Sequence, residues 1–243
     1  MKIEILILAI SPIIACIFWI YLKDKYDKEP TSALTKYFCL GILTSFICII
    51  VENLLQRLYS SQGIIFILYT SFIVAGLAEE LIKAIILIPN LTREKYFNEK
   101  LDGIIYSVFL SLGFATIENI IYIVNESYEY VFQLGLSRAI ISVPAHIMFG
   151  ITMGYYIGKF KFEKNKNKKL KYIFMSIFIP VLLHGIFDFI LMIRYKWSIG
   201  IFIAYIIFLW KINLDKLDKY ILFSKLKFLR NIKNRKKHWN TFL

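Results

Sequence analysis

Residues 64–90 read IIFILYTSFIVAGLAEELIKAIILIPN, and this stretch decides the fold because it is an apolar run that carries three charged side chains. A helix needs roughly 20 mainly apolar residues to cross a bilayer. The charges are Glu79, Glu80 and Lys83, spaced so that Lys83 lies one helical turn after each carboxylate and can face either. Charges inside lipid need partners or a function, so this span predicts an intramembrane site.

Similar apolar runs lie on both sides of this stretch. Together they give about seven candidate spans, at residues 4–22, 34–55, 64–90, 103–124, 137–158, 170–193 and 197–214. The 243-residue chain is 58% apolar, which is too much for a soluble domain to cover with polar groups. No small-residue cleavage site follows the first run, so we expect a retained span. We therefore predict an all-α, polytopic transmembrane bundle over 1–214, followed by a basic tail over 215–243.

The positive charges predict the orientation of this bundle. If the N-terminus is outside, 24 Lys and Arg residues fall inside and five fall outside, with Lys83 buried in its span. The five outer cations are Lys2, Arg57, Arg138, Arg194 and Lys196. The positive-inside rule then places the C-terminus in the cytoplasm. There the tail would form either an amphipathic surface helix or a partly disordered segment, and the net charge of +13 suits anionic lipids rather than nucleic acid.

Ionisable residues also interrupt the three spans that follow. A rise of about 1.5 Å per residue places Glu80, Glu118, His146 and His184 roughly 15 to 22 Å from the inner ends of their helices. That depth is near the middle of a hydrocarbon core about 30 Å thick. Asp188 lies one turn after His184, where it could orient the imidazole. We expect four helices to contribute to one polar site.

Small residues predict where two spans pack closely. Gly150, Gly154 and Gly158 recur every four residues on one face of the fifth span. Small residues at this spacing let two membrane helices approach closely. We therefore expect this face to pack against another span.

The polar residues of these spans fall into short motifs. They are EExxK at 79–83, FxxxEN at 114–119, His146 within AHIMFG at 145–150, and HxxxD at 184–188, preceded by the charged segment DKYDKEP at 24–30. In order and spacing they resemble the PrsW family of bacterial membrane proteases, a relative of the CAAX prenyl proteases. The resemblance covers about residues 20–195, and four motifs in order are far more specific than EExxK alone.

This resemblance implies a function in the bacterial cell membrane. PrsW proteins make the first, site-1 cut in a membrane-anchored anti-sigma factor, so the expected partner is a single-span membrane protein. At the position of Glu118 the CAAX prenyl proteases carry His, which disfavours a prenylated substrate. The basic tail lies outside the resemblance.

The residue types favour peptide hydrolysis by an activated water. Glu79 or Glu80 would be the general base, with Lys83 tuning the pair. His146 and His184 would polarise the scissile carbonyl, and Asp188 would orient His184. The expected site comprises the catalytic residues Glu79, Glu80, Glu118, His146, His184 and Asp188, supported by Lys83 and Asn119. No cofactor is favoured, although a zinc-dependent alternative would use His146, His184 and Glu80 as ligands.

A different class of function uses the same residue types. Intramembrane carboxylates, Lys and His also serve as proton relays, so an ion-coupled transporter or a membrane sensor is the alternative. Many transporters contain inverted repeats, and none stands out in this sequence. That absence and the four ordered motifs favour the protease.

Overall fold

The computed structural model describes residues 3–59 and 62–240, and these residues form helices with no strand among them. The helices are α1 Ile3–Lys23, α2 Thr31–Leu58, α3 Ile64–Tyr69, α4 Ala78–Thr92, α5 Lys100–Val124, α6 Val131–Ser137, α7 Val143–Phe162, α8 Lys166–Ile193 and α9 Ser198–Asn240. Two π-helical segments complete them: η1 Thr70–Leu77 joins α3 to α4, and η2 Arg138–Ser142 joins α6 to α7. The predicted all-α class is confirmed.

Six helical segments of the described chain are long and apolar enough to cross a membrane. They correspond to the predicted spans other than 64–90. That stretch is also helical, running from Ile64 to Thr92 as α3, η1 and α4, but it is not one of the six. The orientation, with the N-terminus outside, stays a prediction.

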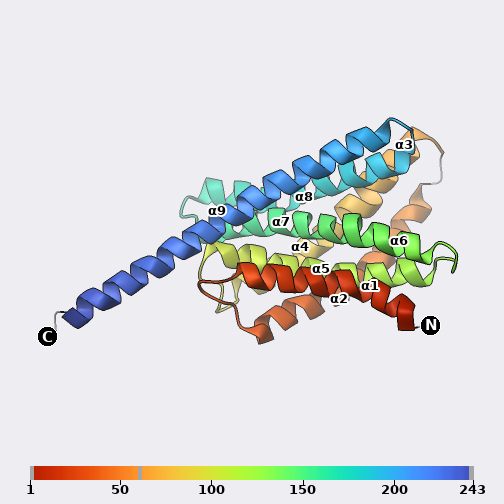
Figure 1. The fold of residues 1–243 in the computed structure, drawn as a ribbon. Helices are drawn as coiled ribbons and strands as arrows, with labels where there is room; N and C mark the ends of the chain where they lie inside the picture. The colour runs from red at the N-terminus through yellow and green to blue at the C-terminus, as the bar shows by residue number, and fades with distance from the viewer. Residues whose placement is uncertain (1–2, 60–61, 241–243) are drawn as a thin grey trace.

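Helix α9 continues past the predicted end of the last span at residue 214. It runs from Ser198 to Asn240 without a break, and its C-terminal part projects beyond the bundle (Figure 1). The sequence after Gly200 contains neither Gly nor Pro, the residues that most often end helices. Lys, Leu and Ile, which are frequent in this part, allow the helix to continue. The last predicted tail residues, 241–243, lie outside the described part.

Helix α5 forms the centre of the bundle and is buried along most of its length (Figure 1). It packs against α1, α2 and α7. Glycines set the contact with α7, because a Cβ added to Gly103 would lie 2.7 Å from the carbonyl oxygen of Gly154 and 3.0 Å from the nitrogen of Gly158. The predicted glycine face of the fifth span therefore packs on α5, which holds Glu118 against α7.

A set of acidic side chains lies at the end of the bundle from which α9 projects, and we call it the loop cluster. Its members are Asp24, Asp27, Glu29, Glu99 and Asp102. Asp102 and Glu99 form a capping box at the start of α5, where Asp102 Oδ2 accepts from the backbone nitrogens of Asn98 and Glu99, both at 2.8 Å. These carboxylates therefore hold the loop that leads into the central helix.

The loop between α1 and α2 is fastened by the same cluster. Asp24 Oδ2 accepts from the backbone nitrogen of Glu29 at 2.8 Å, and the Tyr106 hydroxyl donates to Glu29. Burial disfavours the charged forms, which raises the pKa of Asp24 to about 6 and that of Glu29 to about 7.

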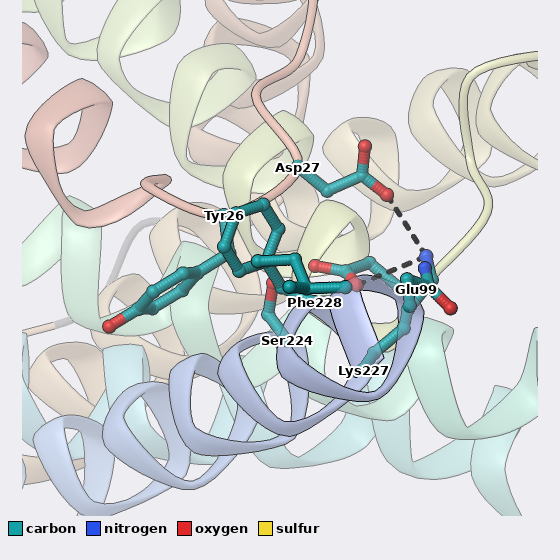
Figure 2. Close-up of a pocket in the computed structure, with 8 residues that line it drawn as sticks. Tyr26, Asp27, Glu99, Ser224, Lys227 and Phe228 are labelled. Atoms are coloured by element: carbon teal, nitrogen blue, oxygen red, sulfur yellow. Dashed lines mark hydrogen bonds and ion pairs between the residues drawn. The ribbon is translucent and has the colours of Figure 1, made fainter. Parts of the chain in front are cut away.

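One side chain of α9 joins the loop cluster. Figure 2 shows Lys227 pointing from α9 toward Asp27 and Glu99. Its ammonium donates to Asp27 Oδ2 at 2.9 Å, Glu99 Oε2 at 3.3 Å and Asn98 Oδ1 at 2.6 Å. The contact ties the last helix to two loops that are far away in sequence.

Candidate active site

The first turn of α4 presents two carboxylates that share one ammonium group. Lys83 Nζ donates to Glu80 Oε1 at 2.7 Å and to Glu79 Oε2 at 3.0 Å. Glu80 has no exposed surface, and Lys83 is 1% exposed. The sequence predicted that Lys83 could face either carboxylate, and the structure shows that it contacts both. Buried charges of this kind persist only when they are paired.

Helix α8 brings a histidine to the same carboxylates. His184 Nδ1 lies 3.1 Å from Glu80 Oε1, and Nε2 lies 3.2 Å from Asp188 Oδ2. The ring stacks on Phe149, with centroids 4.6 Å apart. Both ring nitrogens therefore face carboxylate oxygens, and ionised carboxylates only accept hydrogen bonds. This arrangement suits a doubly protonated, cationic His184.

A second carboxylate–histidine pair lies across the site. Glu118 Oε2 of α5 is 2.6 Å from His146 Nε2 of α7. Among the described residues this carboxylate oxygen has no partner with hydrogen-bond geometry, and neither does His146 Nδ1. The rings of His146 and His184 lie edge to face with centroids 5.7 Å apart, so the two pairs form one site.

Arg138 completes the site from the first position of η2. Its Nη2 lies 3.1 Å from Glu118 Oε1, and its Nε donates to Asn119 Oδ1 at 2.6 Å. Asn119 in turn donates from Nδ2 to the backbone oxygen of Ala9 at 2.6 Å. Sequence analysis placed Arg138 among the outer cations, whereas the structure places it 6% exposed beside a predicted site residue.

We call this group the intramembrane cluster. It consists of Glu79, Glu80, Lys83, Glu118, Asn119, Arg138, His146, His184 and Asp188. All six predicted catalytic residues and both supporting residues are in it, so the predicted convergence of four spans is seen in the structure. Their chemical roles stay predictions.

The cluster opens into two cavities. The larger, of about 720 Å³, is lined by Glu79, Glu118, Arg138, His146, His184 and Asp188 among others. The smaller, of about 330 Å³, lies between α2, η1 and α5. Glu79 and Glu118 line both, whereas Glu80 lines neither of them. Of the two adjacent glutamates, Glu79 is therefore the one that water or a substrate can reach.

The smaller cavity also contains a carboxylate that the sequence did not assign to the site. Glu52 of α2 lines it together with Glu79 and Glu118. Its position near the end of the predicted span 34–55 suggested an interfacial residue. Helix α2 instead continues to Leu58, which keeps Glu52 within the bundle. Residue counting gave no signal for this placement, because it did not show that the helix continues past residue 55.

Each π-helical segment ends shortly before a site residue. Segment η1 ends at Leu77, two residues before Glu79, and η2 ends at Ser142, four residues before His146. A π-helical turn adds a residue to the ladder and so rotates the side chains that follow, which is why such turns often occur at functional sites. Sequence periodicity assumes 3.6 residues per turn and could not reveal this rotation.

Two groups of side chains could hold a metal ion. Glu79, Glu80 and His184 form one, and Glu79, Glu118 and His146 form the other, each with ligand atoms within 4.8 Å of one another. The predicted set of His146, His184 and Glu80 is neither of these, because the two histidines belong to different groups. Glu80 and His184 already contact each other, and each has a second partner: Lys83 for Glu80 and Asp188 for His184.

Comparisons with known proteins identify similar chains. A family model described as "PrsW family intramembrane metalloprotease" matches residues 29–212. A protein named Protease PrsW from Clostridioides difficile (strain 630) is 57% identical over 98% of this chain and 100% of its own length. Protease PrsW from Bacillus subtilis (strain 168) is 36% identical, covering 86% of this chain and 92% of its own. No solved structure matches this chain significantly.

Proposed function

Because the chain belongs to the PrsW family of intramembrane proteases, and is thus a multi-pass membrane peptidase, we propose that it makes the first cut in a single-span, membrane-anchored anti-sigma factor. The supporting observation is a water-accessible carboxylate, Glu79, in the wall of a cavity of about 720 Å³ inside a helical membrane bundle. A cavity of this volume has room for a short stretch of peptide. The transporter or sensor alternative is set aside because the family is one of proteases.

Glu79 is the general base in this proposal. It faces both cavities, whereas Glu80 is fully buried between Lys83 and His184. A base must lie within hydrogen-bond reach of the water that it activates, and only Glu79 of this pair can do so. Glu80 then acts through its neighbours, because it holds both Lys83 and His184 in place.

Glu79 and His184 carry the protons in the proposed reaction. The water oxygen bonds to the carbonyl carbon as its proton passes to Glu79, and the C–N bond then breaks. The departing amine takes a proton from His184, whose cationic form Glu80 and Asp188 stabilise. Glu79 Oε2 lies 4.0 Å from His184 Nδ1, so the proton on Glu79 can restore His184 after the amine has left.

The matching family is one of intramembrane metalloproteases, and the intramembrane cluster contains donor atoms that suit a divalent ion. Glu118 and His146 fit such an ion, because both line the larger cavity and Glu79, Glu118 and His146 each offer a ligand atom within 4.8 Å of the others. Glu79 would lie beside the ion as the base. Glu80 and His184 are less suitable ligands because other side chains already hold them. When bound, a divalent ion supplies a Lewis acid for the scissile carbonyl.

The charges of the cluster also leave room for a bound cation. Four carboxylates face Lys83, Arg138 and the cationic His184, which leaves a charge of minus one. A buried cluster is stable only when its charges are compensated.

Reconstitution tests the proposed substrate class. The purified protein would be placed in liposomes with a single-span anti-sigma factor, and the fragments would be mapped by mass spectrometry. We expect one cut in or beside the span, and no cut in a single-span control protein of unrelated sequence. Intact anti-sigma factor alongside cleavage of the control protein would refute the substrate assignment while leaving the protease activity in place.

A further inference from the structure

Glu118 can act together with His146, as a pair beside Glu79, only if its carboxylate holds one orientation. A carboxylate has two equivalent oxygens and can rotate about its last bond. Glu118 must nevertheless present one oxygen to His146, which lies on another helix. Arg138 is the cationic side chain in direct contact with the other oxygen.

Arg138 is itself held on three sides. Its Nη2 contacts Glu118 Oε1, its Nε donates to Asn119 Oδ1, and its guanidinium carbon lies 4.2 Å from the centre of the Tyr122 ring. All three partners belong to α5. A planar guanidinium can bind two acceptors with its edge while its face rests on an aromatic ring, and an ammonium cannot do the same.

Asn119 fixes the direction of this contact. Its amide nitrogen donates to the backbone oxygen of Ala9, so its amide oxygen must face Arg138. The resulting chain of contacts runs from α1 through Asn119, Arg138 and Glu118 to His146 on α7. The FxxxEN motif thus supplies both the carboxylate and the amide that orients its partner.

We propose that Arg138 is a positioning residue for proteolysis, which fixes Glu118 so that its second oxygen faces His146. The proposal rests on the proposed function of the intramembrane cluster. Arg138 acts through Glu118 and is not assigned a step of the reaction. Misplacement of a catalytic group by about 1 Å can cost roughly 100-fold in rate, so removal of the guanidinium should lower kcat much more than it raises KM.

The test uses the full-length protein in liposomes with a cleavable single-span substrate. We expect Arg138→Ala to lower kcat about 100-fold, and Arg138→Lys to restore little of it. Methylguanidinium added to Arg138→Ala should recover activity, because the large cavity reaches this position, and methylammonium should not. Arg57→Ala, at an exposed position on α2, is the matched control and should keep the wild-type kcat.

A double variant separates positioning from mere stability. Glu118→Gln combined with Arg138→Ala should be no slower than Glu118→Gln alone, and methylguanidinium should not rescue it. Wild-type kcat in Arg138→Ala, or a loss that is fully additive with Glu118→Gln, would overturn the proposal. If Arg138→Ala does not fold, Arg138→Lys takes its place, and wild-type kcat there would equally overturn it.

A second measurement does not depend on the substrate. Diethylpyrocarbonate modifies accessible histidines, and mass spectrometry can follow His146 and His184 separately. Loss of Arg138 should speed modification of His146 while that of His184 stays at the wild-type rate. Unchanged modification of His146 would refute the positioning role even if the substrate assignment failed, whereas failure of wild type to cut its substrate would count against the proposed function alone.

Discussion

Two clusters that contain buried carboxylates differ in what these carboxylates contact. In the intramembrane cluster the carboxylates contact the side chains of Lys83, Arg138 and two histidines, and Glu79, Glu118 and Asp188 line a cavity. In the loop cluster the carboxylates accept mainly from backbone nitrogens and a tyrosine hydroxyl, with Lys227 as their cation (Figure 2). Both contain buried carboxylates, so burial alone does not identify a functional site.

The difference shows how partners decide the role of a buried acid. A carboxylate that accepts hydrogen bonds from backbone nitrogens holds a loop in place, so its removal would weaken the fold. A carboxylate paired with titratable side chains beside a cavity can exchange protons with bound water. Variants in the intramembrane cluster should therefore change cleavage, and variants in the loop cluster should change stability.

The largest effect should be on bound metal. Wild-type protein purified without chelators should contain about one divalent ion per chain, and both Glu118→Gln and His146→Ala should lose it. Glu80→Gln should keep it, because Glu80 already binds Lys83 and His184. Mass spectrometry of the metal content measures all four proteins. Equal metal content in wild type and both ligand variants would rule out the assigned ligands.

Replacement of Asp188, which faces His184 Nε2, should have a smaller effect. Asp188→Asn should reduce the cleavage rate about tenfold, the equivalent of roughly 1.5 kcal/mol for a hydrogen bond to a charged group. Asp27→Asn in the loop cluster is the matched control and should cleave at the wild-type rate. If both variants cleave equally fast, Asp188 has no role in orienting His184.

The loop cluster should make stability depend on pH. The pKa of Asp24 is raised from 3.8 to about 6 and that of Glu29 from 4.5 to about 7, so the folded protein binds protons more tightly than the unfolded chain. Stability should be greatest below pH 4 and fall as the pH rises through about 7. A fall in Tm by about 5 °C between pH 5 and pH 8 is expected.

The variants Asp24→Asn and Glu29→Gln together provide the control for this pH dependence. They replace two titrating groups with neutral ones of the same shape, so their Tm should fall less than the wild-type Tm between pH 5 and pH 8. A wild-type Tm that rises over the same pH range would show that the sign of these shifts is wrong.

The smallest effect should come from the contact between α9 and the loops. Lys227→Met should lower the free energy of unfolding by about 1 kcal/mol or less, because the side chain is 40% exposed and water screens the pairs. Lys225→Met, on the exposed side of the same helix, should have no effect. Denaturant titration of both variants checks the difference, and equal values would show that Lys227 does not fasten α9.

The sequence predicted the intramembrane cluster well because a charge in an apolar run stands out. Glu80, Glu118, His146 and His184 could be placed at one depth by counting residues, and the structure brings them together. Arg138 escaped this reasoning because it stands near the predicted end of its span, where a cation is ordinary. Its contact with Glu118 depends on the path of α6 and η2, which residue counting does not give.

The loop cluster could not be predicted at all. Asp24, Glu99 and Asp102 lie in polar segments where acidic residues are expected, and only the fold buries them. The sequence left the tail open as an amphipathic helix or a partly disordered segment, and the structure shows it as the continuation of α9. Hydropathy shows where a span leaves the lipid, whereas a helix ends where its backbone hydrogen bonds end.

One paired measurement tests the central claim, namely that the intramembrane cluster performs the cleavage and the loop cluster only holds the fold. Glu79→Gln and Asp102→Ala each remove one buried carboxylate, and both would be assayed for Tm and for cleavage rate per folded molecule. Glu79→Gln should lower the rate by roughly 100- to 10,000-fold without lowering Tm. Asp102→Ala removes the acceptor of two backbone nitrogens, so it should lower Tm while leaving the rate unchanged. Cleavage by Glu79→Gln at the wild-type rate would contradict the account.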